Sequence, residues 1–103
     1  LFGLVGSEMC IRDRDIDEYS NYFSEHPFVN VLSESPKVKD VRGTNNCNLY
    51  FQELKKNNDL NSYRIISVID NLTKGASGQA VQNMNLLFDF EETLGLNNMS
   101  LYP

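Results

Sequence analysis

The spacing of apolar residues changes at residues 70–71, and this change constrains the fold more than any other feature of the chain. Residues 62–69 carry apolar side chains on both faces of an extended segment, which predicts a strand buried in a sheet. From residue 72 to residue 88, apolar residues recur three or four positions apart, which predicts a helix. The opposite face of this predicted helix carries Lys74, Gln82 and Asn85.

The remaining segments predict an α+β domain with a partial antiparallel sheet and a C-terminal helix. Residues 15–25 have helical spacing, and the helix should end near His26-Pro27, because proline cannot continue it. Strand patterns occupy residues 28–32 and 47–54, with a possible short strand at 37–42. The expected connections are a loop at 33–36, a turn at 43–46, a polar hairpin connection at 55–59 and a closing loop at 91–103.

Composition narrows the classes of function. With 103 residues, of which 41% are hydrophobic, the chain can form one small packed domain. The net charge is −5 and the basic residues are scattered, so an electrostatic footprint for nucleic acid is absent. No apolar run approaches the roughly 20 residues that cross a bilayer. Two cysteines make no disulfide framework, so we expect a cytoplasmic protein. From the charge and the lack of a long apolar run, we expect neither nucleic acid nor a membrane as a partner.

The junction between the predicted strand and helix is the main candidate site. Such a junction collects exposed backbone N–H groups and the positive end of the helix dipole. Asp70 or Asn71 can cap the helix. Gly75 and Gly78 make its first turns small, although glycine costs a helix about 1 kcal/mol relative to alanine. Either close packing on a sheet or close approach of a ligand or a facing subunit would explain these glycines.

Other reactive residues give weaker signals. His26 lies at a predicted helix end, where a solvated histidine interacts favourably with the helix dipole. Cys47 has no histidine near it in sequence and is expected to be buried and inert. The pair Glu91-Glu92 fits a solvated turn better than an acid–base dyad. The sequence holds no metal-ligand spacing, no Walker loop and no G-x-G-x-x-G, so we assign no catalytic residue and no metal.

Residues 4–13, LVGSEMCIRD, resemble the translation of a transposon-type sequencing adapter read in one frame. The two leftover adapter nucleotides, AG, begin an Arg or a Ser codon, and Arg14 follows. Such a segment stands outside fold reasoning. We therefore expect residues 1–14 to be non-native and the native sequence to begin near Asp15; the alternative is a genuine N-terminal strand and turn.

Three stretches of residues 38–96 resemble the C-terminal region of the N-acetyl-gamma-glutamyl-phosphate reductase family. Residues 41–47, VRGTNNC, resemble its V-R-G-(S/T)-N stretch. Residues 70–85, DNLTKGASGQAVQNMN, resemble its D-N-L-x-K-G-A-x-G-Q-A-x-Q-N-M-N signature, and residues 90–96, FEETLGL, its closing (F/Y)-x-E-T-x-G-L. Aspartate-semialdehyde dehydrogenase shares the D-N-L-x-K-G-A core but usually continues differently. Asp89 departs from the family, which commonly has glycine there.

The resemblance implies what the whole enzyme does and which part this is. It implies an NADPH-dependent, homo-oligomeric enzyme that reduces an acyl phosphate, N-acetyl-L-glutamyl 5-phosphate, to its semialdehyde in arginine biosynthesis. Residues 15–103 would be the end of the catalytic and dimerisation domain of a glyceraldehyde-3-phosphate-dehydrogenase-like enzyme. The dinucleotide-binding domain, the nucleophilic cysteine and the assisting histidine would lie upstream, and Cys47 does not match the nucleophile's motif.

The resemblance also implies the cofactor-binding residues. In the wider dehydrogenase superfamily an asparagine at this strand-to-helix junction contacts the nicotinamide carboxamide, and here that residue is Asn71, with Gly75 as the second cofactor-binding position. Three alternatives stay open. The chain could come from the related lysine-pathway reductase, from aspartate-semialdehyde dehydrogenase, or from a non-catalytic binding or assembly module.

Overall fold

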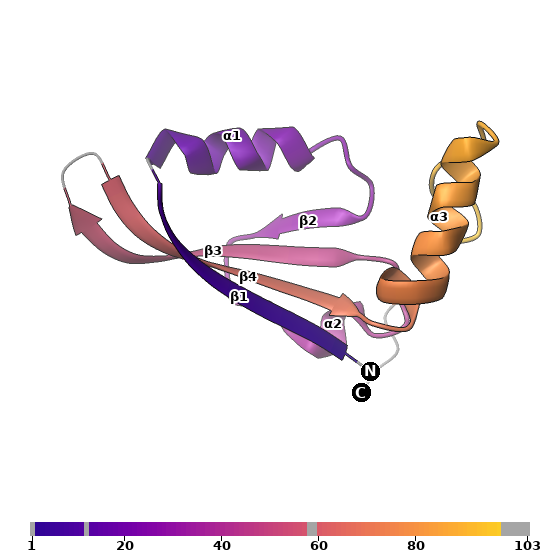
Figure 1. Ribbon diagram of the computed structural model, residues 1–103, viewed down its shortest axis with the longest axis horizontal. Coiled ribbons are helices and arrows are strands. Elements are labelled where there is room, and N and C mark those ends of the chain that lie inside the picture. The colour runs from indigo at the N-terminus through magenta and orange to yellow at the C-terminus, as the bar shows by residue number, and fades with distance from the viewer. Residues whose placement is uncertain (1, 12, 58–59, 98–103) are drawn as a thin grey trace.

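The computed structural model describes residues 2–11, 13–57 and 60–97, with side chains from residue 17 to 54 and from 62 to 97. The elements run in the order β1 (Phe2–Ile11), α1 (Asp13–Phe23), β2 (Val29–Leu32), α2 (Val38–Val41), β3 (Cys47–Asn57), β4 (Leu60–Asp70), a π-helical turn η1 (Thr73–Ser77) and α3 (Gly78–Leu87). Figure 1 shows α1 lying beside β2, and α3 standing at one end of the sheet.

One four-stranded sheet, in the order β1-β4-β3-β2, organises the chain. β4 pairs antiparallel with β3 on one side and with β1 on the other. β2 joins the sheet parallel to β3, through a crossover over residues 33–46 that contains α2. The predicted α+β class is therefore confirmed. The predicted buried strand is also confirmed, because β4 lies inside the sheet and buries Tyr63 and Val68.

One predicted strand and one predicted connection were wrong. Residues 37–42 form the short helix α2 (Val38–Val41), not a strand. One helical turn places Val38 and Val41 on the same face and buries Val41 completely, which an exposed strand would not do. The hairpin connection expected at 55–59 is shorter, since β3 runs to Asn57 and β4 begins at Leu60. An irregularity in the register between Glu53 and Lys55 accompanies this polar extension of the hairpin.

The segment expected to be non-native contributes the edge strand β1. Its backbone pairs with β4 from Phe2 opposite Asp70 to Ile11 opposite Asn61. A free edge of β4 presents unpaired N–H and C=O groups that an extended segment of any origin can satisfy. The pairing therefore does not bear on the origin of the codons, and the adapter interpretation stays a prediction.

Helix α1 contacts the sheet through one aromatic pair, and it contacts the segment that follows it through two more. The ring of Tyr19 stacks on that of Phe51 in β3, with centroids 5.6 Å apart. Tyr22 and Phe23 both contact the ring of His26, which follows the helix end and is exposed, as expected for a histidine at this position. The predicted helix is thus confirmed, although it begins at Asp13 and ends at Phe23.

The predicted C-terminal helix is divided and turns an unusual face to the sheet. After a turn at Asn71 and Leu72, the chain forms η1 and then α3. An amphipathic helix ordinarily buries its apolar face. Here the buried positions of α3 are Gly78, Gln82 and Asn85, all on the face that the sequence marks as polar or small. The large apolar side chains Met84, Leu86 and Leu87 are exposed, Leu87 to 80%.

Candidate functional site at the strand-to-helix junction

Asp70, the last residue of β4, fixes the start of the junction. It is buried, and its Oδ1 accepts hydrogen bonds from the backbone N–H groups of Leu72 (2.9 Å) and Thr73 (3.3 Å). Its Oδ2 accepts a third from the N–H of Gly43 (2.6 Å). Burial by itself raises the pKa of this carboxyl, but the three backbone hydrogen bonds outweigh it and hold the pKa below its usual value. Of the two predicted capping residues, Asp70 therefore takes that role.

Asn71, the predicted cofactor-binding residue, is exposed beside Gly75, the second predicted position. A β-carbon added to Gly75 would lie 2.7 Å from the Asn71 Oδ1 atom and 3.5 Å from the Ile69 Cδ1 atom. Glycine at 75 therefore makes room for the Asn71 amide. Within the described part of the chain, that amide donates no hydrogen bond and accepts none, so its donor and acceptor both remain open to a ligand.

The turn that carries Gly75 is a π-helix, Thr73–Ser77. The Ser77 N–H donates to the Leu72 carbonyl at 3.1 Å, and the Ser77 hydroxyl donates to the same oxygen at 2.9 Å. Single π-helical turns are rare and occur frequently at functional sites. The sequence did not predict this turn; the only signal for it was the run of small residues around Gly75 and Gly78.

Beneath the turn lies a group of buried and half-buried polar side chains that we call the Gln82 cluster: Asn45, Lys74, Gln82, Asn85 and Glu92. The Gln82 Oε1 atom accepts from Lys74 Nζ (2.8 Å) and from Asn45 Nδ2 (2.9 Å). The Gln82 Nε2 atom donates to Glu92 Oε2 (2.7 Å). One amide thus joins the π-helical turn, the turn before β3 and the segment after α3.

Asn85, in the same cluster, holds the segment that follows α3. Asn85 is fully buried, and its Nδ2 donates to the carbonyl oxygens of Glu92 (3.1 Å) and Leu94 (3.0 Å). A β-carbon on Gly78 would overlap the Asn45 Oδ1 atom, so for Gly78 the close-packing explanation applies. No sequence pattern indicated this cluster: Glu92 was expected on a solvated turn, whereas it is half-buried.

Lys74 is a half-buried cation at the edge of the cluster. Burial lowers the pKa of its ammonium, while Cys47 and Glu92 act in the opposite direction, and the net shift is downward. The Lys74 Nζ atom also lies 5.5 Å from the centroid of the Phe28 ring. Cys47, which the sequence predicted to be buried, is only half-buried, with its Sγ atom 3.4 Å from the Ser67 hydroxyl.

Two surface hollows lie elsewhere and contain neither Asn71 nor Gly75. One, of about 570 Å³, lies against α1; its described lining is Glu18, Tyr19, Tyr22 and Phe23. The other, of about 600 Å³, runs between the end of α1 and β2. Across the described residues, no three His, Cys, Asp or Glu side chains gather as metal ligands. In the same residues, no helix combines the length and apolar character needed to span a membrane.

Comparison with known proteins gives a family and a set of relatives. The sequence profile described as "Semialdehyde dehydrogenase, dimerisation domain" matches residues 8–71, which end at the junction. The N-acetyl-gamma-glutamyl-phosphate reductase of Ruthia magnifica is 48% identical over 89% of this chain and 26% of its own length. The enzymes of the same name from Methanosphaera stadtmanae (46% identical, 84% of this chain, 25% of its own length) and a Thermoanaerobacter species (38%, 98% and 31%) are also similar. The chain spans about a quarter to a third of the length of these curated relatives.

Proposed function

We propose, because the chain belongs to the semialdehyde dehydrogenase family through its dimerisation domain, that it is the C-terminal part of an N-acetyl-gamma-glutamyl-phosphate reductase. The intact enzyme would reduce N-acetyl-L-glutamyl 5-phosphate to the semialdehyde with NADPH in arginine biosynthesis. The names of the relatives support this reaction and do not favour aspartate-semialdehyde dehydrogenase, the lysine-pathway enzyme or a binding module. The family description supports a homo-oligomer, and the biosynthetic role supports a cytoplasmic location.

The observation that carries the proposal is the exposed amide of Asn71 over Gly75. A nicotinamide carboxamide carries both an acceptor and a donor, and an asparagine amide matches both. Asp70 and the π-helical turn hold the backbone on either side of Asn71, so the amide would meet the cofactor with little left to order on binding. When bound, NADPH supplies the hydride.

The division of labour within the intact enzyme follows from the residues that the chain carries. This chain would orient the cofactor through Asn71, and Gly75 would leave the space that the Asn71 amide occupies. The nucleophilic cysteine and the assisting histidine belong to the remainder of the intact enzyme. Neither half-buried Cys47 nor exposed His26 is assigned a catalytic role.

Residues 15–103 are the native part of the chain in this proposal, and residues 1–14 derive from adapter sequence. The similarity to the family profile begins at residue 8, inside the segment in question. The genomic sequence around codon 15 tests the proposal directly. We expect the reading frame to continue upstream into a cysteine motif and a glycine-rich cofactor loop, and not into codons for residues 4–13; genomic codons for LVGSEMCIRD would contradict the adapter origin.

A chimeric reductase tests the function. In the chimera, residues 15–103 of this chain replace the matching C-terminal segment of the Ruthia magnifica reductase. We expect NADPH-dependent turnover of N-acetyl-L-glutamyl 5-phosphate by the chimeric reductase and none by the 103-residue chain alone. Turnover by the chain alone would contradict the fragment proposal.

The role of Asn71 is tested in the same protein. Asn71→Leu removes the amide, and the loss of a hydrogen bond worth about 1.4 kcal/mol raises the KM for NADPH about tenfold. The control is Asn83→Leu, since Asn83 is an exposed asparagine on α3 whose amide oxygen accepts a hydrogen bond from Gln79 (2.9 Å). Equal KM values for NADPH in the two variants would refute the cofactor role of Asn71.

A further inference from the structure

We propose that Gln82 is a positioning residue for the cofactor site: it fixes the π-helical turn through Lys74 and so sets the orientation of the Asn71 amide. This inference rests on the proposed function, since it concerns how the same site is aimed. Gln82 itself does not touch the cofactor-binding face. It is 8% exposed and lies one turn into α3, below the junction.

The hydrogen bonds of Gln82 leave its amide a single favourable orientation. Its oxygen faces two donors, the Lys74 ammonium and the Asn45 amide nitrogen. Its nitrogen faces an acceptor, the Glu92 carboxylate. A flipped amide would set N–H groups against the two donors and oxygen against the carboxylate. Because buried polar groups are costly when unpaired, the cluster resists such rearrangement.

The connection from Gln82 to Asn71 runs through the π-helical turn. Lys74, which Gln82 holds, is the direct neighbour of Gly75, and Gly75 lies against the Asn71 amide oxygen. The start of the turn is held separately by Asp70, through the N–H groups of Leu72 and Thr73. The turn is thus fixed at its first residue by β4 and at its second, Lys74, by α3. Release of the second attachment would let Lys74 and Gly75 shift relative to Asn71.

Asn45 makes the attachment rigid with respect to the sheet. It is fully buried in the turn that precedes β3, and it packs over Gly78 while donating to Gln82. The cluster therefore does not merely tie two parts of the same helix together. It fixes the position of the helix start relative to the sheet, and the orientation of the Asn71 amide depends on that position.

The test uses Gln82→Met in the chimeric reductase, which nearly conserves volume and removes all three hydrogen bonds. We expect the KM for NADPH to rise five- to tenfold, while the KM for the acyl phosphate stays within twofold. The matched control is Gln79→Met on the same helix, because within the described residues the Gln79 amide bonds to Asn83 alone, on the helix surface. We expect no change in either KM from this control. A parallel rise of both KM values in Gln82→Met would show a general structural role and overturn the proposal.

A double variant separates this proposal from the proposed function. If Gln82 acts through Asn71, Gln82→Met adds nothing to the KM for NADPH once Asn71→Leu is present. An equal additional rise in that background overturns the positioning role and leaves the cofactor role of Asn71 intact. If Asn71→Leu alone leaves the KM for NADPH unchanged, the proposed function itself is refuted. If Gln82→Met fails to fold, Gln82→Glu takes its place, because it keeps the oxygen that accepts from Lys74 and Asn45. We then expect a smaller rise in the KM for NADPH, again without a change in the KM for the acyl phosphate. An unchanged KM for NADPH would overturn the proposal.

Discussion

Strand β4 and helix α3 are separated only by the junction, yet they bury opposite kinds of side chain. β4 has a strand on each side and buries Val68 completely. Among the described residues, the buried positions of α3 are on its polar or small face; Asn85 is completely buried, whereas Leu87 is 80% exposed. The comparison teaches that periodicity locates an element, whereas the surfaces available for packing decide which face is buried. In the chimeric reductase we expect the remainder of the longer protein to cover the apolar face of α3.

The largest effect should come from a charge on the buried face of α3. Asn85→Asp turns two donated hydrogen bonds into repulsion between a carboxylate and the carbonyl oxygens of Glu92 and Leu94. An unpaired buried charge costs about 3–5 kcal/mol, and we expect the chimeric reductase to lose that much stability in urea denaturation. The control Asn83→Asp places the same charge on the exposed face of the same helix and should change stability by less than about 0.5 kcal/mol. Similar losses from both variants would remove the distinction between the two faces.

The next effect concerns the end of β4. Asp70→Asn removes the carboxylate that accepts from three backbone N–H groups, and we expect a loss of about 1.5–3 kcal/mol at neutral pH. The pKa of Asp70 is lowered by folding, so its stabilisation is present above the unfolded pKa of about 3.9 and is lost as the pH falls through the lower, folded pKa. Denaturation of the two proteins between pH 7 and pH 3 should therefore show a difference that shrinks below about pH 4. A constant difference across this range would show that the charge of Asp70 is not responsible.

A third test asks whether the outer face of α3 becomes covered in the longer protein. Leu87→Ser in the chimeric reductase should cost about 1.5 kcal/mol if that face is buried there, as expected for the transfer of a leucine side chain out of water. Thermal melting of the chimeric reductase and the variant measures this loss. A change below about 0.5 kcal/mol would mean that the leucine stays exposed, and the contrast between β4 and α3 would then be intrinsic to the fold.

The elements with long apolar patterns were predictable from the sequence. β4 and β3 follow from apolar side chains that a sheet can bury, and α1 from aromatic residues at helical spacing, of which Tyr19 packs on Phe51. α2 was not predictable, because four residues carry too little periodicity to separate a strand from one helical turn. The parallel pairing of β2 with β3 depends on that helix and was missed with it.

The candidate site was predictable only in part. The resemblance to the reductases supplied Asn71 and Gly75, and the structure places them together, while their contact with a cofactor stays a prediction. The Gln82 cluster was invisible to local patterns, because the hydrogen bond from Asn45 to Gln82 joins residues 37 positions apart. A glutamine on the polar face of a helix is indistinguishable in sequence from a solvated one until the packing partner is known.

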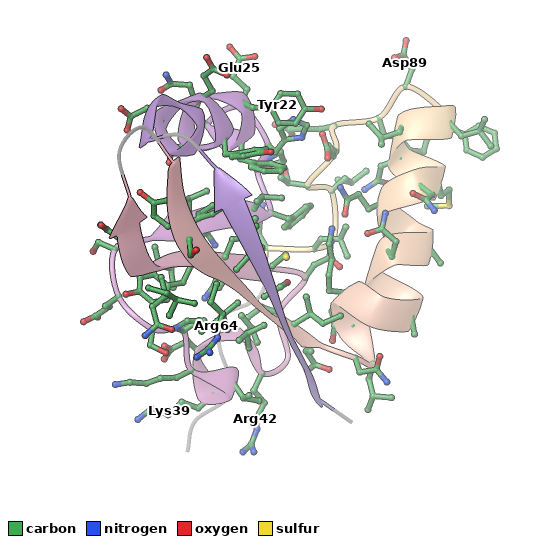
Figure 2. All side chains as sticks on the ribbon, turned by 60° about the vertical axis from the view of Figure 1, so that its left-hand side comes forward. Tyr22, Glu25, Lys39, Arg42, Arg64 and Asp89 are labelled. Atoms are coloured by element: carbon green, nitrogen blue, oxygen red, sulfur yellow. The ribbon has the colours of Figure 1, made fainter. Side chains whose placement is uncertain are left out.

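The smallest effect lies at the C-terminal end of α3, farthest from the junction, where Figure 2 shows Asp89 pointing away from the rest of the molecule. Asp89 has φ = 60°, the left-handed conformation that glycine favours, and the Phe90 N–H donates to the Asn85 carbonyl at 2.8 Å, which closes the helix in a Schellman motif. The strained backbone and the negative charge near the helix C-terminus both disfavour aspartate there, while the freedom of glycine in the unfolded chain offsets part of the gain.

Asp89→Gly should therefore stabilise the chimeric reductase by about 0.5–1 kcal/mol, measured by urea denaturation. Asp89→Ala removes the charge but keeps the β-carbon, so it should recover less. If Asp89→Ala is as stabilising as Asp89→Gly, the strain at this position is negligible and only the charge matters. Because Asp89 is exposed at the opposite end of α3 from the junction, the KM for NADPH should be the same in all three proteins, whereas we expect a substitution of Gln82 to raise it.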